Sequence, residues 1–414
     1  MTSRTRRTHL SALAGLALSM LTVAAAPALG ADASEARHFA DERGISVADA
    51  AQRLDWQRAA GQLVDEAEAG LGERFGGVWV DPGDGDRVKL GVTAADGATR
   101  ANAKRALARV GLDGSADVVE VEHSQRELEA AGGWIAARLE QANGGAPEVL
   151  GTGIRTDVNS VEISLPRNGN LSRAQRALVD DARARFGAAV RTRESHSGRP
   201  ARRACVHPYC DPPLRAGIRI NGDGSFCTGA FIARGRDAGY LYQMTAGHCR
   251  YDPNATWSSK FPNGTSHAIG TFRNIRVDST TDAGILNINN VAGWAPRDFI
   301  LITNSPDTSF TDTYKVLNDG NSVVNMRVCT TGAAWGQSDC GYVSQTNATI
   351  TDEYGTTSGL VRANFCGIDG DSGAPMYSYN VAYGLQIDGY SMCDSLYTPI
   401  RVAENAMNVD VVFE

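Results

Sequence analysis

The cysteines of this chain are confined to its C-terminal half. All eight lie beyond residue 204, at Cys205, Cys210, Cys227, Cys249, Cys329, Cys340, Cys366 and Cys393. In an exported chain an even set of cysteines favours disulfide bonds over a metal site, because metal-binding thiolates need reducing conditions and close Cys-x-x-Cys pairs. The asymmetry predicts two regions with different folding requirements, the second cross-linked by disulfides, with no bound metal or cofactor.

The first 30 residues are typical of an export signal. Arg4, Arg6 and Arg7 precede an apolar run from Leu10 to Ala26, and small residues continue through Gly30. This is the pattern of a secretory signal peptide. A membrane anchor is the alternative, but the run is short and rich in Ala and Ser. We expect residues 1–30 to be removed and the rest to be secreted and extracellular, by either the Sec or the twin-arginine route.

Length and charge narrow the possible partners. A chain of 414 residues with 42% hydrophobic residues is long enough for two or three packed domains. The net charge of −7 argues against a nucleic-acid partner, because phosphates require a basic face. We expect a globular protein that is a monomer and has no stable membrane anchor.

Residues 31–200 predict an α+β unit in which hairpin, helix and strand occur twice. The first copy is a helix at 46–71, interrupted near Gly61, then a hairpin at 78–80 and 88–92, a helix at 101–110 and a strand at 118–121. The second is a helix opened by the capping box Ser124–Glu127, a hairpin at 153–157 and 161–165, a helix at 172–186 and a strand at 188–191. Neither copy contains a combination of serine, histidine and aspartate motifs typical of a catalytic site. The sequence therefore indicates no catalytic activity for this unit.

The pattern changes at the end of this unit. The basic stretch 191–203 lacks periodicity and predicts an exposed, cleavable linker, with a basic ligand patch as the alternative. From Cys205 onward, short apolar runs alternate with Gly, Asn, Asp and Pro. Strands and turns at this spacing predict an all-β barrel or sandwich.

A serine between glycines stands near the C-terminal end, in the segment Gly370-Asp371-Ser372-Gly373-Ala374-Pro375. Glycines beside a serine allow a tight turn that exposes the hydroxyl and leaves neighbouring N–H groups free to face an anion. The same residue types also form ordinary turns, so the hexapeptide alone does not identify a nucleophile.

Two further segments supply the partners that a serine nucleophile needs. His248, between Gly247 and Cys249, is the candidate base that takes the serine proton. Asp282, at the head of a short apolar run, is the candidate acid that orients the imidazole, and Asp278 is its rival. The order His, Asp, Ser is that of the chymotrypsin-like β-barrels and differs from the orders in subtilisin and the α/β-hydrolases.

These three segments, in this order and at these distances, resemble the bacterial chymotrypsin-like serine proteases of the streptogrisin and α-lytic protease type. The resemblance implies an all-β double six-stranded antiparallel barrel over residues 201–414, with a cleft between the barrels. His248 and Asp282 would come from the first barrel and Ser372 from the second.

The N-terminal region also resembles this family. Phe75–Asp81 and Val161–Leu165 look like parts of the propeptides of α-lytic-type proteases, which implies an α+β pro-domain at 31–200. An unrelated accessory domain is the alternative. The family implies that the chain's own propeptide is a partner that aids folding and then inhibits the cleft.

The resemblance implies a secreted serine endopeptidase, made as a preproenzyme, that cuts protein or peptide substrates through an acyl-enzyme. Ser372 would be the nucleophile, and the N–H groups of Gly370 and Ser372 would bind the oxyanion. A non-catalytic binding protein on the same fold is the alternative. Such proteins usually lose a triad member, whereas all three are present here.

The family also implies the disulfides and the substrate pocket. The pairs are Cys227 with Cys249, Cys329 with Cys340, Cys366 with Cys393 and, by elimination, Cys205 with Cys210. The pocket residues are Asn364 and Phe365 on one wall and Ile387, Asp388 and Gly389 on the other. Because strand side chains alternate, Asp388 is expected to point toward the outer subsites rather than the base of the primary pocket.

Two positions depart from the family. Bacterial relatives pair the aspartate beside the nucleophile with an arginine shortly after the cysteine that corresponds to Cys329. Here that position is Thr330, which leaves Arg327 as the nearest candidate partner of Asp371. Ile387 replaces a serine of the primary pocket wall, so its side chain cannot donate a hydrogen bond to Asp282.

Overall fold

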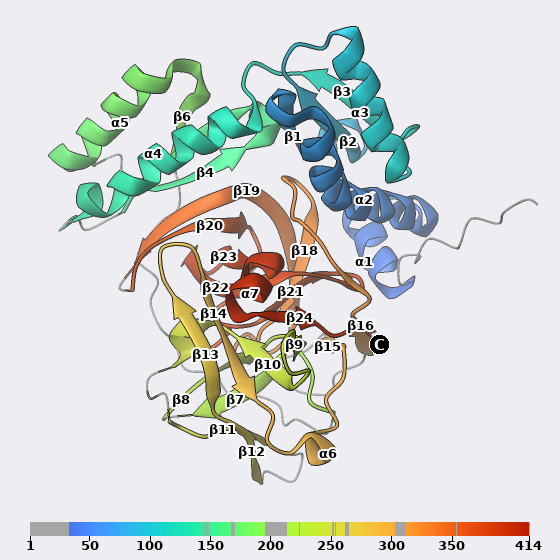
Figure 1. Cartoon of the computed structure of the whole chain (residues 1–414), viewed down its shortest axis with the longest axis vertical. Coiled ribbons are helices and arrows are strands. Elements are labelled where there is room, and N and C mark those ends of the chain that lie inside the picture. Colours follow the sequence, from blue (N-terminus) through green and yellow to red (C-terminus); the bar gives the residue numbers. More distant parts are fainter. Residues whose placement is uncertain are drawn as a thin grey trace, which may run out of the picture. The chain divides into compact units, whose positions relative to one another are not determined.

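The structure is a computed structural model of the chain (Figure 1). It describes residues 33–144, 146, 149–166, 170–194, 213–222, 224–250, 252, 254–260, 265–302, 312–352 and 354–413. The expected signal peptide, most of the expected linker, and the pair Cys205 and Cys210 lie outside the described residues.

Two helices open the described part, α1 (Ala33–Arg43) and α2 (Val47–Leu71). Ser46 caps α2, because its side chain accepts a hydrogen bond from the N–H of Asp49. The expected interruption near Gly61 is wrong, since α2 is continuous there. A Cβ atom at Gly61 would lie 2.5 Å from the carbonyl oxygen of Asn321, so this glycine permits a close approach to the β-rich region.

The α+β region contains the expected elements in the expected order. The first copy has β1 (Phe75–Asp81), β2 (Arg87–Val92), α3 (Gly97–Arg109) and β3 (Ala116–Glu120). The second has α4 (Gln125–Asn143), β4 (Gly151–Arg155), β5 (Ser160–Leu165), α5 (Arg173–Phe186) and β6 (Val190–Glu194). In each copy the hairpin strands are antiparallel, and the last strand joins the second hairpin strand in parallel.

The β-rich region begins with two sheets. Its strands are β7 (Ile218–Gly222), β8 (Ser225–Gly229), β9 (Ile232–Gly235), β10 (Leu241–Thr245), β11 (Trp257–Lys260), β12 (Ser266–Gly270), β13 (Phe272–Val277) and β14 (Asp282–Asn287), followed by the short helix α6 (Val291–Trp294). One sheet has the order β13-β14-β10-β9-β24, where β24 is Val409–Val411, and the other has the order β12-β11-β7-β8.

The second half of this region carries the longest strands. They are β15 (Phe299–Ile302), β16 (Asp312–Lys315), β17 (Asn318–Asp319), β18 (Arg327–Thr331), β19 (Ser338–Asp352), β20 (Gly355–Ala363), β21 (Pro375–Ser378), β22 (Val381–Ser391) and β23 (Asp394–Pro399), followed by α7 (Ile400–Met407). The expected chymotrypsin-like β-rich fold with a preceding α+β region is confirmed. The division into two six-stranded barrels stays a prediction.

One sheet joins the α+β region to the β-rich region. Strand β4 pairs antiparallel with β19, with Ile154 opposite Thr346, and the sheet continues through β5 and β6. Figure 1 shows β4 along the outer side of the orange strand β19. At this junction the side chain of Gln345 donates a 2.8 Å hydrogen bond to Glu162, so the pairing buries a polar contact as well as backbone.

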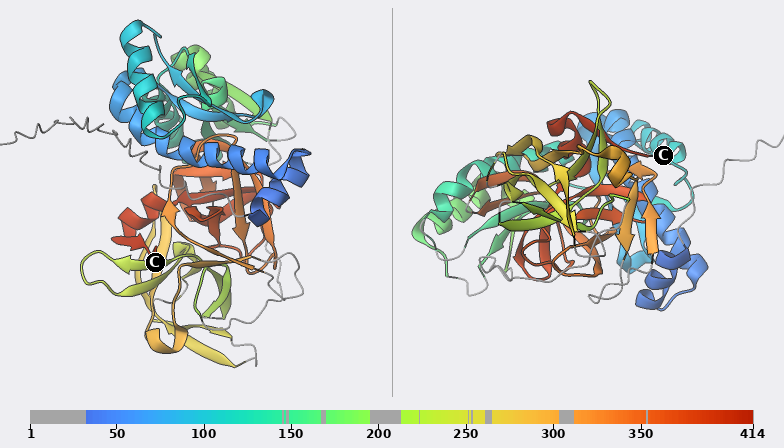
Figure 2. Two further views of the ribbon diagram at one scale, coloured as in Figure 1. Left: turned by 90° about the vertical axis from the view of Figure 1, so that its right-hand side faces the viewer. Right: turned by 90° about the horizontal axis from the view of Figure 1, so that it is seen from below.

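The N-terminal helices also contact the β-rich region. Phe39 of α1 is fully buried in a cluster that includes Tyr379, and the Gln57 side chain accepts a 2.8 Å hydrogen bond from the N–H of Arg327. Figure 2 shows these blue helices against the orange and red strands. A search of the described residues finds no helix with the length and apolar character to cross a membrane.

Candidate active site

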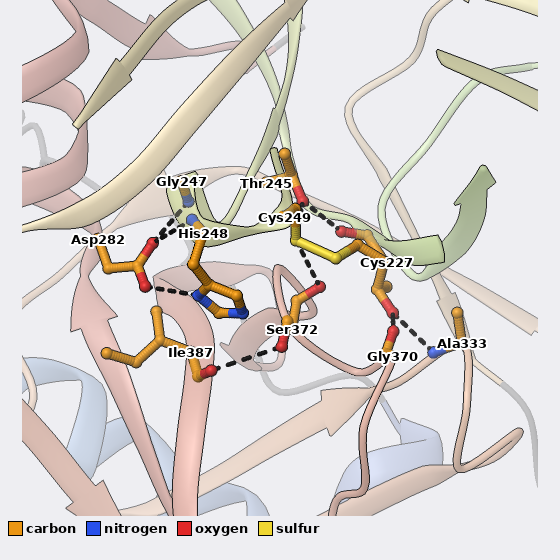
Figure 3. Close-up of a disulfide and its surroundings, with 11 residues drawn as sticks. Cys227, Thr245, Gly247, His248, Cys249, Asp282, Ala333, Gly370, Ser372 and Ile387 are labelled. Carbon is orange, nitrogen blue, oxygen red and sulfur yellow. Dashed lines mark hydrogen bonds and ion pairs between the residues drawn. A yellow bond between two sulfur atoms is a disulfide. The ribbon is translucent and has the colours of Figure 1, made fainter. Parts of the chain in front are cut away.

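His248 and Asp282 come from neighbouring paired strands. His248 lies in a short 3-10 turn, Gly247–Cys249, directly after β10, and Asp282 is the first residue of β14, which pairs with β10. The His248 Nδ1 atom is 2.6 Å from Oδ2 of Asp282. The other carboxylate oxygen accepts hydrogen bonds from the N–H groups of Gly247 at 2.6 Å and His248 at 3.0 Å (Figure 3). The histidine is thereby fixed at both its ring and its backbone.

The rival acid occupies a different environment. The Asp278 carboxylate accepts hydrogen bonds from the N–H groups of Thr280 and Thr281, so it stabilises its own turn. Thus Asp282, and not Asp278, is hydrogen-bonded to His248.

The other histidines of the β-rich half do not take this place. His267 bonds to Thr265 on the edge of the other sheet, and His207 lies outside the described residues.

The surroundings of His248 raise its pKa. Burial disfavours the imidazolium ion and lowers the pKa, but the Asp282 carboxylate, with added contributions from Asp388 and Asp352, outweighs burial. The ring of Tyr354 also stacks on the imidazole, with centroids 5.4 Å apart. Asp352 and Tyr354 come from the tip of the β19–β20 hairpin, so this hairpin reaches the candidate site from the second half of the β-rich region.

Ser372 lies in the loop before β21, on the side of His248 opposite Asp282 (Figure 3). Its hydroxyl donates a 3.5 Å hydrogen bond to the carbonyl of Ile387, and its carbonyl accepts a 2.9 Å hydrogen bond from the N–H of Thr228. Gly373 has a φ of +85°, and a Cβ atom there would lie 2.2 Å from Oγ1 of Thr245. Only glycine fits next to the serine in this turn.

Gly370 also needs to be glycine. Its φ is +98°, and a Cβ atom would lie 2.3 Å from the ring of Phe226. Its carbonyl accepts a 2.9 Å hydrogen bond from the Thr228 hydroxyl, which fixes the peptide that follows it. Within the described residues, the N–H groups of Gly370 and Ser372 donate no hydrogen bond. Two backbone donors beside the serine are therefore open to an anionic ligand.

Asp371 is fully buried between these two residues, and it does not pair with Arg327. Its carboxylate accepts three hydrogen bonds from backbone N–H groups, those of Ala334, Trp335 and Ile368. Burial raises the pKa of Asp371 to about 6, although these donors act in the opposite direction. Arg327 instead bonds to the sulfur of Cys329 and lies near the ring of Phe39. The candidate ion pair of the sequence analysis is therefore absent from the described residues.

Among the described residues there are three disulfide bonds, Cys227–Cys249, Cys329–Cys340 and Cys366–Cys393. The first links β8 to the turn that carries His248. Closing a loop of this length stabilises a fold by about 3 kcal/mol on the chain-entropy model. The disulfide therefore holds the histidine turn against the strand that also carries Thr228.

The expected pocket residues lie in different environments. The side chains of Phe365 and Ile387 are buried within hydrophobic clusters, so these two residues can offer a substrate only their backbone. Asn364 is exposed, while Asp388 and Gly389 are half-buried. The register of β22 against β23 shifts between Gln386 and Asp388, which interrupts the regular strand beside Asp388. The expected direction of the Asp388 side chain stays a prediction. Asp388 nevertheless acts electrostatically on His248.

Several residues around the candidate site could not be predicted from the sequence. Thr228, Tyr354 and the loop 332–335 carry no motif, and their proximity depends on how distant strands pair. No group of three His, Cys, Asp or Glu side chains suited to a metal ion occurs in the parts of the chain that the structure describes.

The pKa of His248 can be tested directly. We expect the imidazole to titrate above its ordinary pKa of 6.5, and Asp282→Asn to lower that pKa because the largest attraction is lost. Asp278→Asn is the control, since its carboxylate bonds within its own turn. The measurement is the imidazole proton signal followed by NMR against pH. A pKa below 6.5 in the unmodified protein, or equal falls in both variants, would contradict the arrangement.

Comparison with known proteins finds one matching family and several similar bacterial proteins. The trypsin family matches residues 202–407. Serine protease 1 of Streptomyces fradiae is 27% identical over 410 residues, which cover 98% of this chain and 98% of the relative. Streptogrisin-C of Streptomyces griseus is 30% identical over 196 residues, which cover 47% of this chain and 39% of the relative. The solved structure of Thermobifida fusca Protease A is 21% identical, with a TM-score of 0.41, and covers 49% of this chain and 100% of that one. Residues 202–407 of this chain belong to the trypsin family of serine proteases.

Proposed function

We propose that the chain is a secreted serine endopeptidase, made as a preproenzyme, in which Ser372, His248 and Asp282 are the catalytic residues. One observation carries the proposal: the His248 imidazole lies between the Asp282 carboxylate and Ser372 (Figure 3). A non-catalytic binding protein on this fold would not need a fixed histidine between a buried carboxylate and a serine.

The proposed reaction begins with proton transfer to His248. Asp282 holds the Nδ1–H group, which leaves Nε2 free to accept the proton of the Ser372 hydroxyl as its oxygen attacks the peptide carbonyl. The same proton then passes to the departing amine, and an acyl-enzyme forms. A water molecule then attacks the acyl-enzyme, with the same proton transfers through His248, and releases the carboxylic acid product. Because neutral imidazole is the base, activity rises as pH rises through the raised pKa of His248.

The negative charge that develops on the carbonyl oxygen also needs donors. The N–H groups of Gly370 and Ser372 are the proposed oxyanion hole, since both are free of hydrogen bonds within the described residues. Each donor of this kind contributes roughly 100- to 1,000-fold in rate. The Thr228 hydroxyl holds the Gly370 carbonyl and so orients the backbone that carries these donors.

The first test of the proposal is removal of the nucleophile or the base. We expect Ser372→Ala and His248→Ala each to remove nearly all peptidase activity, because the triad acts as a unit. His267→Ala is the matched control, since His267 bonds to Thr265 on a sheet edge. Activity is measured on a protein substrate, and an organophosphonate with peptide mass mapping identifies the nucleophile. Turnover near the unmodified level in either triad variant would refute the assignment.

We also propose that residues 1–30 are the signal peptide, that 31–200 is a propeptide and that 201–414 is the protease. The propeptide would assist folding and then inhibit the cleft. Two contacts support this: the pairing of β4 with β19, and a hydrophobic cluster that contains both Leu63 and Val361. A β-rich domain with many non-local pairings folds slowly, so a partner that binds β19 early favours the native state.

Refolding tests the proposed folding role. We expect residues 201–414 to give more active enzyme when residues 31–200 are added in trans. Gly151→Val in the added region should remove the effect, because a Cβ atom there would lie 2.1 Å from the Tyr390 hydroxyl. Gly114→Val is the control, since its Cβ position is open. Equal yields with and without the added region would rule out the role.

We propose further that a neutral, large apolar residue precedes the scissile bond, while Asp388 favours a basic residue further upstream. The support is electrostatic, because Asp388 and Asp352 both act on His248 and so place negative charge near the proposed base. A partly solvated attraction of this kind contributes up to about 1 kcal/mol.

A random peptide library tests this preference. We expect the unmodified enzyme to cut after apolar residues with an upstream basic residue enriched, and Asp388→Asn to lose only the upstream enrichment. Asp352→Asn should weaken the same enrichment. Cleavage confined to positions after Arg or Lys, and lost in Asp388→Asn, would show instead that Asp388 lines the primary pocket.

A further inference from the structure

One residue of the β-rich region has its side chain enclosed by the N-terminal helices. Tyr379 belongs to the turn between β21 and β22, and it is 1% exposed. The other buried residues of its hydrophobic cluster come from α1 and α2 and are Ala36, Phe39, Ala40, Ala50 and Leu54. We call these five residues the α1–α2 surface. The burial of the Tyr379 ring therefore depends on a segment far away in the sequence.

The backbone of Tyr379 is strained. Its φ is +53°, in the left-handed region that glycine adopts readily and a bulky residue rarely does. The turn by itself would thus favour glycine over tyrosine at this position. Strain of this kind persists only where the surroundings hold it, and it is concentrated at functional contacts. Here the surroundings are the α1–α2 surface, so the ring is placed for a contact with these helices.

Arginines of the helices lie near aromatic rings of the β-rich region. The guanidinium carbon of Arg58, in α2, is 5.4 Å from the centroid of the Tyr379 ring. That of Arg43, at the end of α1, is 4.8 Å from the centroid of Tyr342, which packs against the same cluster. A cation at this distance from a ring is attracted to it. The contact therefore selects aromatic side chains rather than apolar ones in general.

The α1–α2 surface is held together within the α+β region. The buried carboxylate of Asp86, in the turn between β1 and β2, accepts hydrogen bonds from Arg43 at 3.5 Å and Arg53 at 2.8 Å. These bonds join both helices to one hairpin. A binding surface that is already ordered loses less conformational entropy when it docks.

This contact lies at the far end of a hairpin from the candidate site. Strand β21 starts at Pro375, shortly after Ser372, and β22 pairs with it and returns to Ile387, whose carbonyl accepts the Ser372 hydroxyl. Tyr379 occupies the turn at the other end. The pairing of β4 with β19 is a separate contact between the same two regions.

We infer that Tyr379 is the anchor by which the β-rich region binds residues 33–58 of its own chain, so that this ring sets how firmly the N-terminal region is held. The inference rests on the proposed function, and it adds a binding contact that is distinct from the candidate site. An aromatic side chain enclosed at the centre of a contact is the usual kind of binding hot spot. The hold on the N-terminal region can therefore be changed without a change in catalysis.

Hydrogen–deuterium exchange of the full chain tests the anchor, with Ser372→Ala as the background to prevent self-cleavage. We expect Tyr379→Gly to speed exchange of the α1 amides about 30-fold, because truncation of a hot-spot residue has at least this effect on binding. The β4 amides should exchange as before. Tyr379→Phe should keep exchange slow, since the ring remains. Tyr240→Gly is the matched control, because Tyr240 is exposed.

A variant on the helical side keeps the inference testable if Tyr379→Gly does not fold. Phe39→Ala should speed α1 exchange to a similar extent, while Val47→Ala, at an exposed position of α2, should not. The double variant with Tyr379→Gly should exchange little faster than either single variant, because both changes remove one contact. Multiplied effects in the double variant, or unchanged exchange in both single variants, would overturn the inference.

Peptidase activity separates this inference from the proposed function. In the chain with Ser372 intact, Tyr379→Gly should give active enzyme earlier, with kcat/KM of the released enzyme within about twofold of the unmodified value. Faster α1 exchange without earlier activity would support the anchor and contradict inhibition by the N-terminal region. Slow α1 exchange in Tyr379→Gly beside a fully active protease would overturn the anchor alone.

Discussion

The hydrogen bond between Asp282 and His248 is the contact on which the site depends. It forms between the ends of two strands that pair directly, so the sheet that contains β10 and β14 fixes its length. Ser372 has no such short-range restraint, because it arrives from the other half of the β-rich region. Its position depends on Thr228, which binds both the Ser372 carbonyl and the Gly370 carbonyl. The disulfide from Cys227 then ties that strand to the histidine turn.

Much of this arrangement was predictable from the sequence, and the reason is local chemistry. Helix starts were found where a serine caps the next turn, as Ser124 and Ser172 do. The candidate site residues were found because glycine and titratable side chains occur in short motifs. The partners of Asp371 could not be found, since backbone N–H groups leave no mark in a sequence. The hairpin tip with Tyr354 was missed because only the pairing of long strands brings it to His248.

The α+β region contributes to the interior of the β-rich region as well as to its surface. One hydrophobic cluster includes Leu63 and Val80 from the first region together with Val328 and Val361 from the second. Helix α1 adds a smaller cluster around Tyr379. These contacts involve the half that supplies Ser372, while His248 and Asp282 belong to strands outside them. In these two clusters the N-terminal residues therefore contact the half of the β-rich region that supplies Ser372.

Strand β19 has fifteen residues and lies between β20 and β4. Strand β18 pairs with its first residues, Ser338–Tyr342, so departure of the α+β region would leave only the later part of β19 without a neighbour on one side. A long regular edge is a template for aggregation. Its register against β20 shifts between Val343 and Gln345, and again on either side of Ala348. Irregularities of this kind interrupt the row of backbone donors and acceptors that a second chain would need. The irregular register therefore makes β19 a poor template for a second chain wherever β4 does not cover it.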